Sequence, residues 1–391
     1  MATFPNLPGV KIQEVPLGAP PIVGVGTSTA GFVGKAPDTA VPVDTAPVQI
    51  TSIDQFKATY VNAATRSTGL SRAVRGFFSN GGTECYVVNV GVEAPDATNA
   101  AAVNAGIDLL GLRDDIEIIA APGSYFIQVS NHLSDQAKLL RDRVAILDAP
   151  PKTAITDLEA GGGKRPGDTE WSAFYYPRIL VGPELVDKVT PANGDPLQEA
   201  VTPVGHIAGV YAAVDAARGV HKAPANVGIS GAISTEDLLT DAQNDPLNLD
   251  GVNALRIFAG NVVIWGARTL QAGGNSIDIL FRYINIRRLT NFIEQSLKAG
   301  LRFAVFEPNN LPLRQTITRS VKGFLDGVWR DGALFGATPD EAYYVRFPDP
   351  FNTDADRLAG KLVLEIGLRP APPAEFIIIR IGLLTQSAAA A

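Results

Sequence analysis

Hydrophobic positions in the first 270 residues form short continuous runs, and segments with helical spacing lie between many of these runs. A continuous apolar run bounded by turn residues is typical of a strand that is buried on both faces of a sheet. The expected strands span residues 29–36, 85–90, 115–120, 143–147, 173–181 and 261–267. The expected helices span residues 52–60, 134–141 and 203–218. This order predicts an α/β fold, or a mixed α+β fold, with a partly parallel sheet and helical crossovers.

The last third of the chain has a different pattern. Residues 283–298 and 311–329 show helical spacing, and strands are expected at 302–308, 343–347, 362–368 and 376–381. The longer helix has an apolar stripe that we predict to be buried, made of Leu313, Ile317, Val321, Phe324, Leu325 and Val328. Glycine and polar residues at 271–276 mark the best linker before this module.

Prolines isolate a short apolar segment near each end of the sequence. Residues 10–15 lie between Pro8 and Pro16, and residues 376–381 follow Pro370, Pro372 and Pro373. Proline cannot donate a hydrogen bond to a sheet, and an isolated strand is marginally stable. We therefore predict extended arms that pair with the sheet edge of another copy. For residues 10–15, a local edge strand of the same domain is the alternative.

Composition narrows the class of protein. The single cysteine, Cys85, excludes an internal disulfide framework, and no apolar run approaches the ~20 residues of a membrane span. Residues 1–250 carry 17 Lys and Arg against 28 Asp and Glu, whereas residues 251–391 carry 16 against 12. The basic residues of the last third are spread out, so an acidic protein partner or a solvated surface is favoured over nucleic acid.

Candidates for catalysis are few. The histidines are His132, His206 and His221, and their spacing matches no zinc motif. Ser230 lacks the second glycine of a nucleophile elbow, so a turn is the better interpretation. Glycine-rich stretches at 24–29 and 161–167 fail as phosphate loops. We predict no enzyme activity, no cofactor and no metal site.

Several blocks of sequence resemble one family in composition and order. The blocks cover residues 8–16 (PGVKIQEVP), 28–36, 205–226, 264–270 (IWGARTL), 283–296, 306–347 and 362–381. On these residues the chain resembles the contractile tail sheath proteins of phage tails, pyocin-like bacteriocins and extracellular contractile injection systems. The resemblance is thinnest at about 150–200.

The resemblance implies a structural subunit and its partners. Such subunits stack as hexameric rings around an inner tube and contract after triggering by a baseplate. The expected partners are copies of the same chain, the inner tube protein, and baseplate, terminator or cap proteins, without nucleic acid or membrane insertion. Assembly is expected in the bacterial cytoplasm, as part of a virion tail or a released particle. A soluble α/β enzyme and another structural component of the particle are the alternatives.

The resemblance also implies a division of the chain and a set of contact residues. An N-terminal arm is expected at 1–25, an outer α/β domain at 26–270, a core domain facing the tube at 271–370, and a C-terminal arm at 371–391. The residues expected to exchange strands are Val10, Lys11, Ile12, Gln13, Glu14, Val15, Phe376, Ile377, Ile378, Ile379, Arg380 and Ile381. The candidates for contact with an acidic tube are Arg314, Arg319, Lys322 and Arg330, for which a solvated helix face is the alternative.

Overall fold

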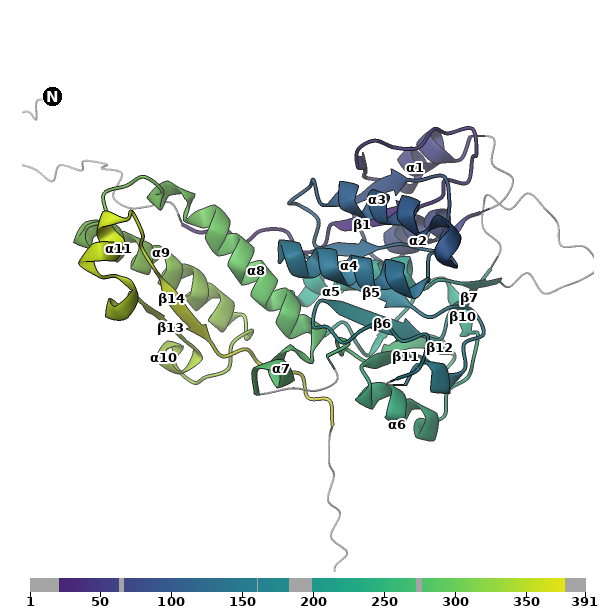
Figure 1. Ribbon diagram of the computed structural model, residues 1–391. Coiled ribbons are helices and arrows are strands. Elements are labelled where there is room, and N and C mark those ends of the chain that lie inside the picture. The colour runs from purple at the N-terminus through teal and green to yellow at the C-terminus, as the bar shows by residue number, and fades with distance from the viewer. Residues whose placement is uncertain (1–20, 63–66, 160, 183–198, 272–275, 377–391) are drawn as a thin grey trace, which may run out of the picture.

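The computed structural model describes residues 21–62, 67–159, 161–182, 199–271 and 276–376. We define the described residues between 27 and 271 as the large lobe, and residues 301–371 as the small lobe. Helix α8 (Ile284–Gly300) runs from one lobe to the other (Figure 1).

A mixed sheet forms the middle of the large lobe, and within the described residues it has nine strands. Their spatial order is β2 (Val48–Ile50), β3 (Cys85–Asn89), β1 (Ala30–Gly34), β4 (Ile118–Ala120), β5 (Val144–Asp148), β6 (Ser172–Tyr176), β11 (Val252–Phe258), β12 (Asn261–Trp265) and β9 (Val227–Gly228). The strands from β3 to β11 in this order are parallel, and β2, β12 and β9 are antiparallel to their neighbours. The prediction of a partly parallel α/β sheet is confirmed.

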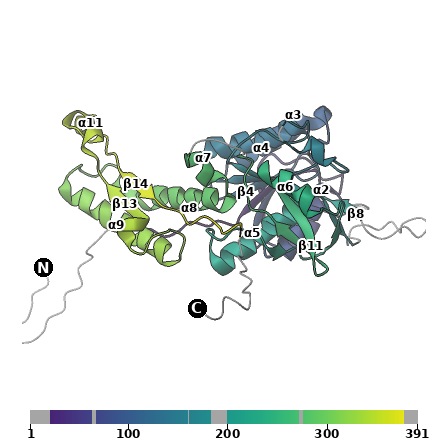
Figure 2. The ribbon, with the colours of Figure 1, turned by 90° about the horizontal axis from the view of Figure 1, so that it is seen from below.

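Helices cover both faces of this sheet (Figure 2). The core on one face contains residues of α1 (Ile53–Tyr60), α2 (Gly69–Ser79) and α5 (Val204–Arg218), and the core on the other contains residues of α3 (Ala100–Leu110), α4 (Ile127–Leu140) and α6 (Asp241–Leu249). Successive strand residues point to opposite faces. In β1, Phe32 packs edge-to-face on Phe77 of α2 with ring centroids 5.7 Å apart, whereas Val33 lies in the opposite core.

The remaining elements of the large lobe are short. A second sheet has the order β10 (Ala232–Thr235), β7 (Ile179–Val181) and β8 (Glu199–Val201), and the 3-10 helices are η1 (Ala97–Asn99) and η2 (Ile155–Asp157). Residues 173–181, predicted as one strand, form all but the first residue of β6 and then β7, which belong to different sheets. The helix predicted at 134–141 begins earlier, at Ile127.

Helices α2 and α5 approach each other closely because glycines lie at their contact. A methyl group at Gly205 would overlap the carbonyl oxygen of Ala73, and one at Gly209 would overlap that of Phe77. The small residues in the sequence of α5 therefore have a packing role. This role explains why a segment with little amphipathic character is a helix buried along most of its length.

His206 of α5 faces Gly76 of α2 and is 5% exposed. Burial, and to a smaller extent the positive charge of Arg75, lowers the pKa of His206 from 6.5 to about 4. The unfolded chain therefore binds this proton at a higher pH than the folded chain. The free energy of unfolding is therefore unaffected by this group above about pH 6.5. It decreases as the pH falls from about 6.5 towards 4, because the unfolded chain then binds the proton and the folded chain does not.

We expect this one group to reduce the free energy of unfolding by about 2 kcal/mol between pH 7 and pH 5. Denaturant unfolding at both pH values measures the change. His206→Leu should remove this part of the acid sensitivity, whereas His132→Leu, at a more exposed histidine of α4, should retain it. Equal acid sensitivity of the wild type and the His206→Leu variant would contradict the assignment.

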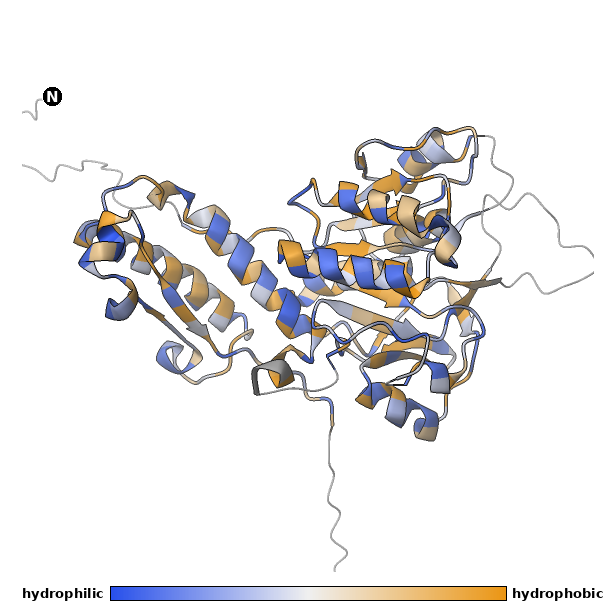
Figure 3. Cartoon of the chain, in the orientation of Figure 1, coloured by the Kyte–Doolittle hydropathy of each residue, from blue (hydrophilic) through white to orange (hydrophobic). Residues whose placement is uncertain are grey.

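The small lobe has its own hydrophobic core. Its elements are η3 (Arg302–Ala304), α9 (Leu311–Arg330), α10 (Pro339–Ala342), β13 (Tyr343–Arg346), η4 (Asp349–Phe351), α11 (Asp354–Leu358) and β14 (Glu365–Leu368), and α7 (Ser276–Phe281) precedes α8. The apolar stripe predicted for residues 311–329 is confirmed: Ile317, Val321, Leu325 and Val328 are buried, and Leu313 and Phe324 pack against them. Figure 3 shows orange, apolar segments on α9 beside β13 and β14.

One predicted strand is wrong. Residues 302–308 form the short helix η3 and a turn after α8. Phe306 adopts a φ of 69° and is fully exposed, at 103% of its reference area. A left-handed backbone interrupts an extended strand, so the apolar residues here do not pair in a sheet.

Candidate functional site

The predicted strand-exchange arms lie almost entirely outside the described residues. Residues 10–15 are outside, and of residues 376–381 only Phe376 is described, with 70% of its surface exposed. Both arms therefore stay predictions. The structure does describe the two segments from which these arms would leave the subunit, and both contact α8 or the residue before it.

The chain that follows the predicted strand-exchange residues 10–15 is described from residue 21, and it runs along α8 (Figure 1). Ile22 is buried in the small-lobe core and contacts Gly300, where an added methyl group would lie 2.7 Å from its side chain. The backbone amide of Val25 donates a hydrogen bond to Ser296 Oγ at 3.1 Å. Apolar packing and a backbone hydrogen bond thus hold this segment against the C-terminal half of the helix.

A buried ion pair fixes the same segment further along α8. Arg288 donates two hydrogen bonds to Asp215 of α5, at 3.0 and 2.6 Å, and one to the carbonyl of Thr27 at 2.9 Å. The hydroxyl of Thr27 donates to Asp215 Oδ2 at 2.6 Å, and the Arg288 guanidinium lies 4.7 Å from the ring centre of Tyr211. We call Thr27, Asp215 and Arg288 the N-terminal anchor. Because the two charged side chains are 3% and 4% exposed, this pair is screened little by solvent.

A second cluster holds the chain just before the C-terminal arm. Glu375 accepts hydrogen bonds from Arg268 Nε and Nη2 at 2.9 and 2.7 Å, from Asn248 at 3.0 Å and from Tyr283 Oη at 3.0 Å. We call these four residues the C-terminal anchor. Tyr283 is the N-cap residue of α8, so the two anchors lie on or beside the same helix.

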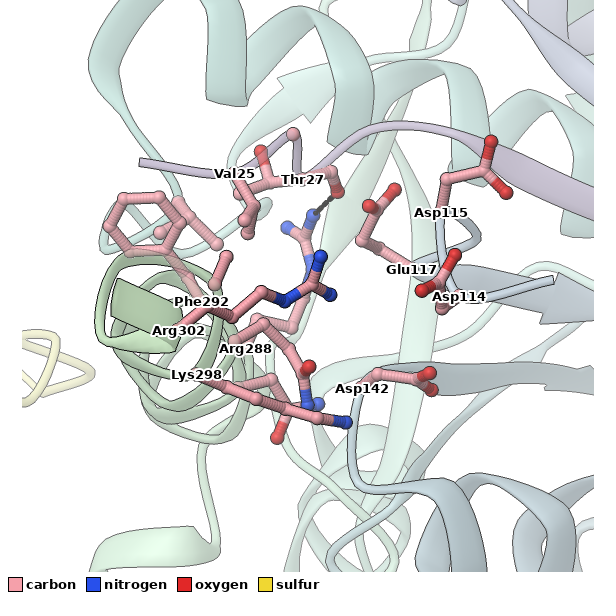
Figure 4. Close-up of a pocket in the computed structure, with 15 residues that line it drawn as sticks. Val25, Thr27, Asp114, Asp115, Glu117, Asp142, Arg288, Phe292, Lys298 and Arg302 are labelled. Carbon is pink, nitrogen blue, oxygen red and sulfur yellow. Dashed lines mark hydrogen bonds between the residues drawn. The ribbon is translucent and has the colours of Figure 1, made fainter. Parts of the chain in front are cut away.

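A cavity of about 210 Å³ lies between α8 and the large lobe (Figure 4). Lys298 and Arg302 lie on its α8 side, and Asp142 and Glu117 lie on its sheet side. Burial raises the pKa of Glu117 to about 8, in spite of its hydrogen bond from the Thr29 amide. Glu117 is therefore mostly protonated at neutral pH. The cavity places the cations Lys298 and Arg302 opposite the carboxyl group of Asp142 at the joint between the lobes.

The other candidates for chemistry are dispersed. Ser230 lies in a turn, as predicted. Its backbone exchanges hydrogen bonds with the side chain of Asn80. Cys85 is buried, and burial raises the pKa of its thiol. Within the described ranges, three or more His, Cys, Asp or Glu side chains nowhere gather in a way that could hold a metal ion. Of the helices in that part of the chain, none is both long and apolar enough to span a membrane.

The four predicted tube-contact residues all lie on α9. Arg319, Lys322 and Arg330 are exposed, whereas Arg314 is partly buried, hydrogen-bonded to Asn309 and 5.7 Å from the ring centre of Phe347. The structure thus leaves three of these cations accessible to a partner and gives Arg314 contacts within its own lobe.

Two consecutive family models match the chain. The phage tail sheath protein central domain matches residues 90–270, and the phage tail sheath C-terminal domain matches residues 277–383. The chain belongs to the phage tail sheath family. The resemblance seen in the sequence is confirmed, as is the expectation of a structural, non-enzymatic protein, because this is a family of tail sheath structural proteins.

Two curated tail sheath proteins are related in sequence. The tail sheath protein of Burkholderia phage BcepMu is 25% identical over 292 residues, which are 71% of this chain and 58% of that protein. The tail sheath protein of Escherichia phage P2 is 28% identical over 179 residues, which are 44% of this chain and 42% of that protein. The chain therefore spans about half the length of these two phage relatives.

Solved sheath structures match over nearly the whole chain. The sheath of an extracellular contractile injection system, PVC, in its contracted state has a TM-score of 0.77 and 25% identity, covering 99% of this chain and 100% of that chain. The contracted helical sheath of the anti-feeding prophage has a TM-score of 0.74 and 27% identity, covering 97% and 99%. A sheath tail protein from Desulfitobacterium hafniense, at 11% identity and a TM-score of 0.62, shares the fold.

Proposed function

We propose that this chain is the structural subunit of a contractile sheath, which polymerises as stacked hexameric rings around an inner tube and contracts to drive that tube through a target envelope. The observation that carries the proposal is the likeness to the PVC sheath over 99% of this chain and 100% of that one, which includes both lobes. The proposed partners are further copies, the inner tube protein, the baseplate, and terminator or cap proteins. Assembly in the bacterial cytoplasm belongs to the same proposal.

The proposed division of the chain follows the two lobes. We propose an arm at 1–25, an outer domain at 26–270, a tube-facing core domain at 271–370 and an arm at 371–391. The boundary between the two domains is supported by the family models, because the central-domain match ends at residue 270 and the C-terminal-domain match begins at residue 277. Support also comes from the separate hydrophobic core of the small lobe.

The strand pair of the small lobe is the proposed receiver of the arms. Strands β13 and β14 pair antiparallel over four residues each, from Tyr343 opposite Leu368 to Arg346 opposite Glu365. In the part of the chain that the structure describes, they form a sheet of only two strands. A two-stranded sheet is marginally stable in water, so further strands would stabilise it. We propose that residues 10–15 and 376–381 of neighbouring copies supply them.

This arrangement explains how a sheath could shorten without coming apart. Main-chain hydrogen bonds between a donated strand and its receiver hold each connection, while the proline-containing tethers allow the subunits to rotate as rigid bodies. The connections persist while the packing of the lobes against neighbours changes.

Electron microscopy of the purified protein tests the function. A sheath subunit is expected to form long cylinders of uniform width, at least when the inner tube protein is present. Discrete oligomers under all conditions would favour a soluble α/β enzyme, and incorporation elsewhere in the particle would favour another structural component.

The exposed cations of α9 are the proposed contact with an acidic inner tube. Reversal of charge at Arg319 and Lys322 is expected to reduce co-assembly with the tube protein severalfold at low salt, because opposite charges across an interface favour association and are screened by salt. Co-sedimentation at low and high salt measures the effect. Reversal at Lys138 and Lys152, exposed cations of the large lobe, is the matched control. Unchanged co-assembly of the α9 variant at every salt concentration would exclude the contact.

A further inference from the structure

The C-terminal anchor lies at the boundary between the fixed body of the subunit and its C-terminal arm. We propose that Glu375 is a positioning residue for assembly: its contacts with the large lobe fix where the C-terminal arm leaves the subunit, and strand exchange with a neighbouring copy depends on this fixed point. The inference rests on the proposed function and adds a specific residue to it.

The first support is the set of donors that meets one carboxylate. They come from three places in the fold: Asn248 in α6, Arg268 after β12, and Tyr283 before α8. The Arg268 side chain is 6% exposed and the Glu375 side chain is 18% exposed. Burial of a charge is costly unless the charge is paired and hydrogen-bonded. Because donors from three elements meet at the Glu375 carboxylate, this site is specific for that side chain.

The carboxylate is held in its charged form. Burial alone would raise the pKa of Glu375, but the hydrogen bonds from Arg268 and Asn248 more than offset burial, and the pKa is lowered. Hydrogen bonds to a charged acceptor are stronger than neutral ones. The contact therefore persists at neutral pH.

The path of the chain shows what this contact controls. The amide of Ala371 donates to the carbonyl of Ala333, so residue 371 is still fixed to the small lobe. Pro372 and Pro373 then bring the chain to Glu375 on the large lobe. With Glu375 bound, the proposed donated arm leaves the subunit after residue 375. Without this contact it leaves after residue 371, and residues 372–375 lengthen the tether by up to about 13 Å.

The position of Glu375 relative to the other terminus gives the contact a geometric role. Ile22 contacts Gly300 at one end of α8, and Tyr283, which binds Glu375, immediately precedes the other end. A helix of 17 residues is about 25 Å long. The helix thus separates the two departure points by a fixed length, provided that Glu375 stays bound. A donated strand with a fixed origin has a higher effective concentration at its receiver than one on a longer tether.

The test compares Glu375→Gln with a matched control away from the arms and their proposed receiving strands. Glu170→Gln removes a similar carboxylate, which is 23% exposed and accepts a hydrogen bond from the buried Arg287 at 2.9 Å. We expect Glu375→Gln to be a soluble, folded subunit with wild-type secondary structure that forms cylinders only at a concentration about tenfold higher than the wild type, because its arm is less well placed. Glu170→Gln should assemble at the wild-type concentration.

A second readout separates positioning from a general loss of stability. Hydrogen exchange of the Ala374, Glu375 and Phe376 amides should be faster in Glu375→Gln monomers, while exchange in α8 and β14 stays unchanged. Arg268→Lys, which keeps the charge but loses the paired geometry, should give a smaller defect of the same kind.

Each remaining outcome would overturn the inference. These outcomes are assembly of Glu375→Gln at the wild-type concentration, an equal defect in Glu170→Gln, or an assembly defect with unchanged exchange at residues 374–376. If the wild-type protein itself forms no cylinders with its tube, the proposed function fails instead, so the two failures are distinguishable.

Discussion

Deletion of residues 1–16, or of residues 377–391, is expected to give a folded monomer that forms no cylinders. Both deletions leave the two anchors and the hydrophobic cores intact. They remove the segments that we propose to pair with neighbouring copies, so the monomer keeps its own contacts and loses those between copies. Circular dichroism and thermal unfolding should match the wild type, whereas negative-stain microscopy should show no sheaths.

A mixing experiment serves as the control for this prediction. Because a subunit that lacks one arm keeps its receiving strands, an excess of truncated subunits should shorten the cylinders made by wild-type protein. Normal cylinders from either truncation alone would contradict strand exchange through that arm.

Loss of the carboxylate in the N-terminal anchor should have the largest effect on stability. Asp215→Ala leaves Arg288 buried without its partner, which is expected to reduce the free energy of unfolding by about 3 to 5 kcal/mol. The expected cause is the cost of an uncompensated buried charge rather than the loss of the attraction itself. Denaturant unfolding measures the change.

Two further variants make the interpretation specific. Asp54→Ala removes one partner of a surface ion pair with Lys57, in which the Asp54 side chain is 87% exposed. This variant should change the free energy of unfolding little. The double variant of Asp215→Leu and Arg288→Met should recover part of the stability lost in Asp215→Ala, because apolar residues of similar size can replace a buried pair. A double variant less stable than Asp215→Ala would contradict this explanation.

The sequence predicted those parts of the fold that depend on local patterning. Buried runs such as residues 85–90 became β3, and the apolar stripe of α9 faces the small-lobe core, because strand burial and helical spacing can both be seen in a single segment. Residues 302–308 were predicted wrongly, since an apolar composition alone does not reveal the left-handed backbone at Phe306.

Both anchors escaped prediction from sequence, although their charged residues lie in the blocks that carried the family resemblance. Asp215 and Arg288 are 73 positions apart, and Arg268 and Glu375 are 107 apart, so only the tertiary fold brings them together. Arginine within otherwise apolar segments, as in residues 264–270 and 283–289, was the available indication. An arginine in such a segment is buried only when it is paired, which predicts a distant carboxylate but does not identify it.

The edges of the large sheet influence how the protein avoids unwanted association. Within the described residues, its outer strands are β2, with three residues, and β9, with two. Long exposed edges offer unpaired backbone groups on which other chains aggregate, and very short edges offer few. We therefore expect the edges of the large sheet to offer few sites for association between newly made subunits, which would leave ordered growth to the proposed receiving strands of the small lobe.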